Sequence, residues 1–217
     1  RYFIEHGCQK GLIIVPTVSL CSQLESDFQD YSSHNNWDVY SNVHTIFTGQ
    51  EKSSHKPITI STWQSLNNLL KDTQSGEAKF TIHDFLEDVV CVMVDEVHMA
   101  KADALKTLMT SVFAHVPIRW GLTGTIPKAK FESQALYVSI GPVVGKLSAS
   151  ELQEKGVLAQ CHVNIVQTAE WKEFGSYPEE LKYLVTNQER MEFISGLISE
   201  ISKSGNTLVL VDRIESG

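Results

Sequence analysis

The chain has 217 residues and a mass of 24.3 kDa, enough for one full domain or for one domain and part of another. Hydrophobic residues make up 42% and charged residues 20%, which excludes a disordered chain and predicts a folded protein. The formal net charge is −8 and no segment forms a basic block, which argues against nucleic-acid binding by bulk charge but not against a local groove. The longest apolar run, Val89 to Val94, is too short to span a membrane, so no membrane partner is expected.

The cysteines show neither metal-ligand nor redox spacing, since no C-x-x-C occurs among Cys8, Cys21, Cys91 and Cys161. We therefore expect reduced, buried thiols, which fit a cytoplasmic protein. The first residues contain no initiator Met and no apolar signal core. This start predicts a piece cut from a longer chain.

Short apolar runs rich in β-branched residues alternate with stretches of helical period, which predicts βαβ units around a largely parallel sheet. The expected strands are residues 11–15, 43–48, 57–61, 89–94 and 118–122. They are apolar almost throughout, as strands covered on both faces should be. Helices are indicated over residues 20–31, from Leu66 onwards, over 101–113 and at about 129–138.

A domain boundary is expected after the last of these helices. The sequence then runs through Gly141-Pro142 and an amphipathic segment, 148–155. Two further strands are expected, 163–168 and 207–211, with a helix over 188–203 between them. We predict that residues 1–146 form most of one α/β domain and that 147–217 form a connecting segment and the opening of a second domain.

The most informative motif is Asp95-Glu96-Val97-His98, directly after the apolar strand 89–94. Ligands of open α/β sheets bind beyond the carboxyl ends of the strands, so both carboxylates emerge where a ligand would lie. Such a pair suits nucleotide hydrolysis, because one carboxylate can hold Mg²⁺ and the other can orient or deprotonate water. The alternative is that Asp95 or Glu96 caps the next helix and that His98 is a surface residue.

Two more strands end in polar motifs. Pro16-Thr17-x-x-Leu20-x-x-Gln23 follows the first strand, and its threonine can cap a helix whose free N–H groups could meet a phosphate. Thr123-Gly124-Thr125 follows the strand 118–122 as a compact loop with two hydroxyls. Taken singly, the first is an ordinary strand-turn-helix joint and the second is a turn.

In this order, the three motifs resemble those of the superfamily 2 DExH-box helicases and translocases. The matching stretches are PTVSLCSQ at 16–23 (motif Ia), STWQ at 61–64 (Ib), DEVH at 95–98 (II) and TGT at 123–125 (III), with 207–217 similar to motif IV. The resemblance is strongest to the phage recombination and repair type and covers almost the whole chain. It implies a RecA-like parallel sheet flanked by helices, an incomplete P-loop NTPase domain, followed by the start of a second RecA-like domain.

The resemblance also implies roles for individual residues. Asp95 would hold the Mg²⁺ of ATP through water, and Glu96 would activate the hydrolytic water. His98 would act with them and, together with the loop Thr123, Gly124 and Thr125, couple the nucleotide state to the nucleic acid. One nucleic-acid strand would follow Pro16, Thr17, Gln23, Ser61, Thr62 and Trp63, with DNA favoured and RNA as the alternative. For Trp63 a core role is the alternative to stacking on a base.

The family's phosphate-binding G-x-x-x-x-G-K-[ST] is missing from the sequence. The nearest match, Gly141 to Lys146, has only three residues between its glycines and no hydroxyl after the lysine, so we do not assign it this role. The resemblance places motifs V and VI beyond Gly217. We therefore expect a fragment, inactive alone, of an ATP-dependent helicase that is monomeric and located in the bacterial or phage-infected cytoplasm. The alternatives are a non-catalytic nucleic-acid-binding module and the translocase subunit of a restriction system.

Overall fold

The computed structural model describes residues 10–47, 51–76, 78–99, 106–168 and 172–211. The chain divides into two units, Arg1–Leu147 and Ser148–Gly217. Within the described ranges, no helix has both the length and the apolar character needed to cross a membrane.

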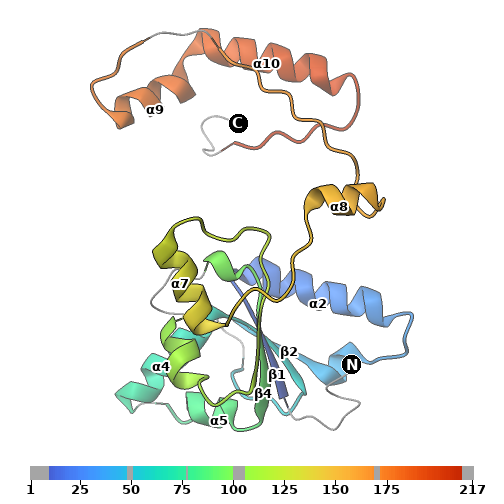
Figure 1. Ribbon diagram of the computed structural model, residues 1–217, viewed down its shortest axis with the longest axis vertical. Helices are drawn as coiled ribbons and strands as arrows, with labels where there is room; N and C mark the ends of the chain where they lie inside the picture. The colour runs from blue at the N-terminus through green and yellow to red at the C-terminus, as the bar shows by residue number, and fades with distance from the viewer. Residues whose placement is uncertain (1–9, 48–50, 77, 100–105, 169–171, 212–217) are drawn as a thin grey trace. The chain divides into compact units, whose positions relative to one another are not determined.

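Five parallel strands form one sheet in the first unit, in the order β2-β3-β1-β4-β5 (Figure 1). The strands are β1 (Lys10–Val15), β2 (Val43–Ile46), β3 (Ile58–Thr62), β4 (Val89–Val94) and β5 (Ile118–Gly121). Every neighbouring pair is parallel, so the carboxyl ends of all five strands lie at one edge of the sheet. The predicted α/β fold with a parallel sheet is confirmed, with small differences at the strand ends.

Helices cover both faces of this sheet, with α2 on one face and α4 and α5 on the other (Figure 1). The helices are α2 (Val18–Ser32), α3 (Val39–Asn42), α4 (Trp63–Ser75), α5 (Ile82–Leu86) and α7 (Lys130–Ser139), with a 3₁₀ turn η1 (Val97–Met99) and a π-helical turn η2 (Leu108–Val112). Of the helix predicted over 101–113, residues 101–105 lie outside the described residues, and the remainder contains η2.

The alternation of side chains along β1 divides the core into two clusters. Leu12 and Ile14 pack into the larger cluster with α4, α5 and η2. Ile13 and Val15 face the smaller cluster, where Cys21 of α2 is buried. Because both faces of the sheet are covered, polar side chains can reach solvent mainly at the strand ends, and the candidate site lies there.

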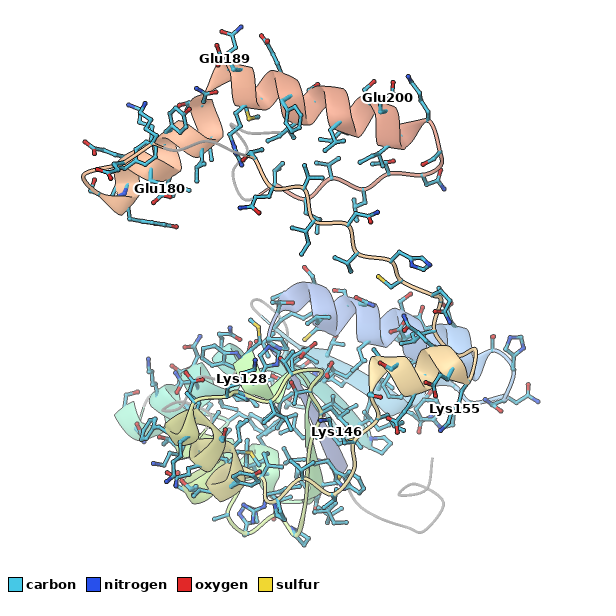
Figure 2. All side chains as sticks on the ribbon, turned by 45° about the horizontal axis from the view of Figure 1, so that its top comes forward. Lys128, Lys146, Lys155, Glu180, Glu189 and Glu200 are labelled. Atoms are coloured by element: carbon cyan, nitrogen blue, oxygen red, sulfur yellow. The ribbon has the colours of Figure 1, made fainter. Side chains whose placement is uncertain are left out.

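The second unit contains α8 (Ala149–Glu154), α9 (Tyr177–Thr186) and α10 (Gln188–Ser202). No residue in the described part of this unit is buried. Acidic side chains of α9 and α10 project into solvent, as Figure 2 shows for Glu180, Glu189 and Glu200. The predicted helix over 188–203 is confirmed, whereas the assignment of this unit to a second RecA-like domain stays a prediction.

Two predictions for the second unit are wrong. Residues 163–168 and 207–211 were expected as strands, but neither segment forms one. A strand needs a neighbour to accept its main-chain hydrogen bonds, and neither segment has one among the described residues. Leu208 and Leu210 accordingly remain 84% and 86% exposed. The prediction of buried thiols is also wrong for Cys161, which is exposed, while Cys21 and Cys91 are buried.

Candidate functional site

The two carboxylates of the site stand where β4 ends. The N–H of Asp95 donates to the Ile14 carbonyl of β1 at 2.8 Å, which continues the ladder by one residue. Asp95 Oδ1 then accepts from the Glu96 N–H at 2.9 Å. Glu96 follows in the left-handed region with φ of 47°, a conformation that costs a non-glycine residue about 1–3 kcal/mol and is concentrated at functional sites. The sharp turn leaves both carboxylates half-buried at the sheet edge.

Glu96 carries an oxygen without a hydrogen-bond partner in a buried position. Its Oε2 lies 3.1 Å from His98 Nδ1, within ion-pair distance, yet it accepts no hydrogen bond. The reason is that His98 Nδ1 is also 2.7 Å from Thr123 Oγ1, and one ring nitrogen has only one proton to donate. The Glu96 side chain as a whole is 42% exposed, so the carboxylate can still meet water or a ligand while Oε2 faces His98.

The Thr123 hydroxyl organises the loop after β5. It donates to the Thr125 carbonyl at 2.8 Å and accepts from the Thr125 N–H at 3.1 Å. Because its single proton is committed to the carbonyl, the bond to His98 requires the proton on Nδ1 of the imidazole. The loop and the turn after β4 are thus tied together through one hydroxyl.

Main-chain hydrogen bonds also join the loop after β5 to the turn after β4. The Leu122 N–H donates to the Val94 carbonyl at 2.9 Å, and the Leu122 carbonyl accepts from the Val97 N–H at 3.0 Å. At Gly121, a side chain would meet Ile140 and Val97 at 3.2–3.4 Å, so this position is packed closely. The spacing between Glu96, His98 and Thr123 is therefore fixed by the sheet.

Most of the residues predicted to contact nucleic acid lie at the ends of β1 and β3, which are neighbouring strands, whereas Gln23 lies within α2. Thr17 caps α2 by accepting from the Leu20 N–H at 3.2 Å, and Thr62 caps α4 by accepting from the Ser65 N–H at 3.2 Å. These residues differ in how far their side chains are exposed to solvent. Thr17 and Gln23 are exposed, whereas Pro16, Ser61 and Thr62 are buried and Trp63 is half-buried against the larger core cluster.

One connection was not foreseen. Gln64 Nε2 donates to the Pro16 carbonyl at 3.2 Å and so joins the ends of β1 and β3. Gln64 belongs to the stretch 61–64, but a single glutamine in the first turn of a helix carries no pattern that marks such a contact. Inside, the buried Ser61 hydroxyl donates to the Ile46 carbonyl of β2 at 3.2 Å.

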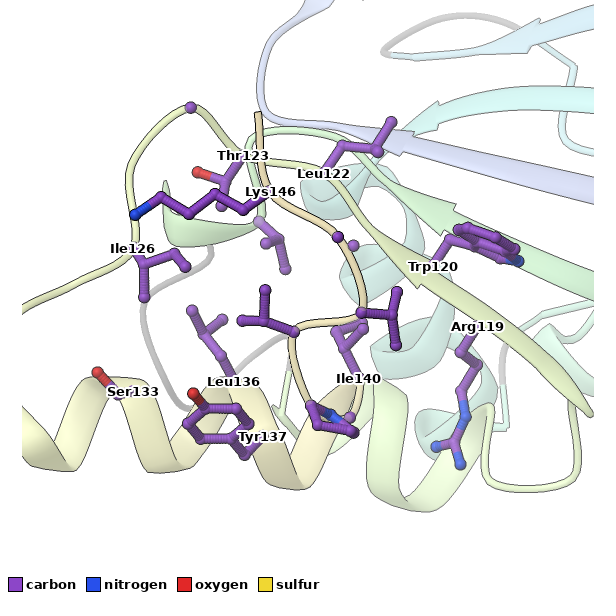
Figure 3. Close-up of a pocket in the computed structure, with 18 of the residues that line it drawn as sticks. Arg119, Trp120, Leu122, Thr123, Ile126, Ser133, Leu136, Tyr137, Ile140 and Lys146 are labelled. Carbon is purple, nitrogen blue, oxygen red and sulfur yellow. The ribbon is translucent and has the colours of Figure 1, made fainter. Parts of the chain in front are cut away.

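A cavity of about 910 Å³ lies beside β5 and is lined by Thr123 and Gly124 at one end (Figure 3). Its walls are β5, α7 and the segment 140–147, with Trp120, Leu136 and Ile140 among the lining residues. Lys146 also lines the cavity (Figure 3). The sequence did not reveal this cavity, because nothing in it specifies that β5 is an edge strand.

The residues present fit a magnesium ion held mainly by water. Two carboxylates, Asp95 and Glu96, supply the hard oxygen ligands that Mg²⁺ prefers, and both side chains are only half-buried. Among the described residues, no group of three or more His, Cys, Asp or Glu side chains could hold a metal directly. Asp95 and Glu96 are the carboxylates that would hold the ion, with water completing its coordination.

Taken together, these features define a parallel α/β domain with an acidic pair and a hydroxyl loop at adjacent strand ends. The chain belongs to the family described as "Type III restriction enzyme, res subunit", whose model matches residues 1–128.

Among individual proteins, the chain is 23% identical over 228 residues to the ATP-dependent DNA helicase uvsW of Enterobacteria phage T4, a match covering 100% of this chain and 42% of that protein. The chain thus spans about two fifths of that relative's length. The crystal structure of the T4 UvsW helicase matches at 25% identity with a TM-score of 0.47, covering 64% of this chain and 45% of that one. The Pyrococcus furiosus Hef helicase domain matches at 16% identity and a TM-score of 0.45, covering 61% and 28%.

Proposed function

We propose that this chain is part of an ATP-dependent DNA helicase or translocase of the repair and recombination type, acting in the cytoplasm. The observation that carries the proposal is the contact of His98 with both Glu96 and Thr123 at the carboxyl edge of one sheet. Family membership and the name of the phage T4 relative, an ATP-dependent DNA helicase, support it.

At the nucleotide end, Asp95 and Glu96 have different roles. Mg-ATP, when bound, supplies the phosphoanhydride bond and the neutralising charge for its cleavage. Asp95 holds the metal through water, since one of its oxygens is already engaged by the Glu96 N–H. Glu96 would orient the attacking water and accept its proton, because its side chain follows β4 at the sheet edge and is 42% exposed.

His98 connects the nucleotide end to the loop after β5. With its Nδ1 proton directed to Thr123, the imidazole leaves Glu96 free to accept a proton. A shift of Glu96 would move the His98 ring, which lies 3.1 Å from Glu96 Oε2 and bonds to the Thr123 hydroxyl. That hydroxyl in turn holds the loop through Thr125. Coupling between nucleotide and nucleic acid is assigned to this path, through Thr123, Gly124 and Thr125.

The nucleic-acid path is assigned to the ends of β1 and β3. Thr17 and Gln23 are exposed and available for direct contact with a phosphate backbone. Pro16, Ser61 and Thr62 are buried and act by positioning the main chain, with Gln64 bridging the two strand ends. Trp63 packs against the core, which favours its structural role over base stacking.

A restriction-type translocase is the second candidate, favoured by the family model that matches residues 1–128. The two candidates share the same site and differ in what the motion accomplishes. Strand separation defines the helicase, and movement along intact duplex defines the translocase.

The test is made on the product of the complete reading frame that contains these residues. Phosphate release from Mg-ATP is measured without nucleic acid, with single-stranded DNA, with duplex DNA and with single-stranded RNA, and displacement of a labelled strand is measured in parallel. We expect turnover stimulated most by single-stranded DNA, together with strand displacement. Stimulation by duplex DNA without displacement identifies the restriction-type translocase, and nucleic-acid binding without turnover identifies a non-catalytic module.

A further inference from the structure

Two residues, Pro16 and Thr17, connect β1 to α2. Pro16 is buried and has no N–H to donate to a neighbouring segment. Thr17 is exposed and extended, with φ of −135° and ψ of 156°. Its hydrogen bonds run forward into α2, since its hydroxyl accepts from the Leu20 N–H and its carbonyl accepts from the Cys21 N–H, both at 3.2 Å. These bonds define the start of the helix but do not fix this turn relative to β3.

A side chain of α4 links the turn to the end of β3. Gln64 Nε2 donates to the Pro16 carbonyl at 3.2 Å, across 48 positions of the sequence. The first carbonyl that accepts within a helix belongs to its N-cap, here Thr17, so α2 leaves the Pro16 carbonyl without a helical partner. Among the hydrogen bonds of the described residues, the one from Gln64 alone joins Pro16 or Thr17 to a segment outside α2.

The main chain of Gln64 is itself held firmly. Gln64 is the second residue of α4, two positions after the N-cap Thr62. Thr62 pairs with Val15 in the ladder between β1 and β3. Further along α4, Leu66 and Leu69 are buried in the larger core cluster. A side chain that extends from such a rigid element holds a neighbouring turn precisely.

The exposure of Gln64 indicates that its bond matters more for position than for folding. Gln64 is exposed, whereas Ser61 and Thr62 of the same stretch are buried. A hydrogen bond at an exposed site adds little to stability, because water replaces it on unfolding and on local opening. Ordering a long glutamine side chain also costs rotamer entropy. The main effect of the bond is therefore to fix where Pro16 and Thr17 lie.

We propose that Gln64 is a positioning residue for the bound nucleic-acid strand. Through the Pro16 carbonyl it holds Thr17 in a fixed place beside the end of β3, so that the exposed threonine meets the backbone of the strand. Gln64 acts through this turn and does not contact the strand itself. The inference rests on the proposed function, because it assigns Gln64 a part in the nucleic-acid path. Without the bond, Thr17 samples more positions and the strand binds more weakly.

The test uses Gln64→Met in the product of the complete reading frame, because methionine nearly keeps the length of the side chain and removes the donor. A labelled oligothymidylate measures affinity by fluorescence anisotropy, and the same oligonucleotide is titrated into an Mg-ATP turnover assay. We expect affinity to fall about three- to tenfold and the half-stimulating concentration to rise by the same factor, with turnover at saturation unchanged. Gln74→Met makes the same change at an exposed position at the opposite end of α4 and should leave both unchanged.

A double-mutant cycle with Thr17→Ala distinguishes positioning from direct contact. If Gln64 acts through Thr17, Gln64→Met should weaken binding much less in the Thr17→Ala background than in the unmodified protein. Additive losses would show that Gln64 contacts the strand itself, and this overturns the proposal.

Urea unfolding separates positioning from a merely structural role. Gln64→Met and Gln74→Met should have the same unfolding midpoint, and an affinity loss that is matched by a lower midpoint overturns the proposal. If the unmodified protein binds the oligonucleotide and Gln64→Met binds it equally well, this inference fails alone. If the unmodified protein does not bind single-stranded nucleic acid, the proposed function fails together with it.

Discussion

Replacing Thr123 with valine removes one hydroxyl and nearly preserves the shape of the side chain. The hydroxyl makes three hydrogen bonds, to His98 Nδ1 at 2.7 Å, to the Thr125 carbonyl at 2.8 Å and from the Thr125 N–H at 3.1 Å. Each contributes about 0.5–1.5 kcal/mol net, and the site is only half-buried, so the lower half of the sum applies. We expect Thr123→Val to lower the free energy of unfolding by about 1.5–3 kcal/mol.

Thr125→Val is the matched control. Thr125 enters the network through its main chain, and its side chain has no hydrogen bond among the described contacts. The control should therefore change stability by less than about 0.5 kcal/mol. Urea unfolding followed by tryptophan fluorescence measures both variants.

A double-mutant cycle with His98→Ala isolates the bond between the ring and the hydroxyl. An interaction energy of about 0.5–1.5 kcal/mol is expected for residues in direct contact. If Thr123→Val and Thr125→Val have equal effects, or if the cycle shows no interaction, the hydroxyl does not connect the two segments and the coupling path fails.

Three further results are expected. Burial raises the pKa of the Cys21 thiol to about 11, so its contribution to the free energy of unfolding is complete below pH about 9 and is lost between about 9 and 11. Urea unfolding midpoints measured against pH should show this loss, and Cys21→Ala should reduce it. Phe113→Ala should cost about 3–5 kcal/mol in urea unfolding because Phe113 is fully buried, and a loss under about 1 kcal/mol would contradict the described core. Ser61→Ala should cost about 1 kcal/mol in urea unfolding through its bond to the Ile46 carbonyl, and should weaken single-strand DNA binding less than Thr17→Ala because Ser61 only positions the main chain. A larger affinity loss than that of Thr17→Ala, at unchanged stability, would indicate direct contact.

The sheet and its polar edge could be predicted because they depend on local patterns. Strands buried on both faces are apolar throughout, and β4 carries this pattern directly before Asp95. The strand before the Thr123 loop was predicted from residues 118–122, although β5 contains Arg119 and is exposed over its last two residues. Parallel strands bring their carboxyl ends to one edge, so these residues were expected to approach each other. This proximity makes a contact between His98 and Thr123 expected, but the sequence does not predict that His98 Nδ1 bonds to the Thr123 hydroxyl.

The wrong or missing predictions concern features that depend on neighbouring segments of the fold, which a local sequence pattern does not specify. The residues 207–211 have the β-branched composition of a strand, but composition specifies a preference for extended backbone and not a neighbour to bond with. The cavity beside β5 was missed for a related reason, since the order of strands in a sheet is a property of the whole fold. The sequence also did not predict that Ser61 is buried, because a serine at a strand end can equally lie on the surface.

The central claim, that Glu96 is the base of a nucleotide-hydrolysing site, is tested most directly by Glu96→Gln in the product of the complete reading frame. The substitution keeps the shape of the side chain and removes its basicity, so Mg-ATP turnover stimulated by single-stranded DNA should fall by about 10²–10⁴-fold while ATP affinity stays close to that of the unmodified protein. Glu87→Gln, at an exposed position of the same unit, is the control and should be unaffected. Near-normal turnover in Glu96→Gln would show that Glu96 only shapes the turn after β4.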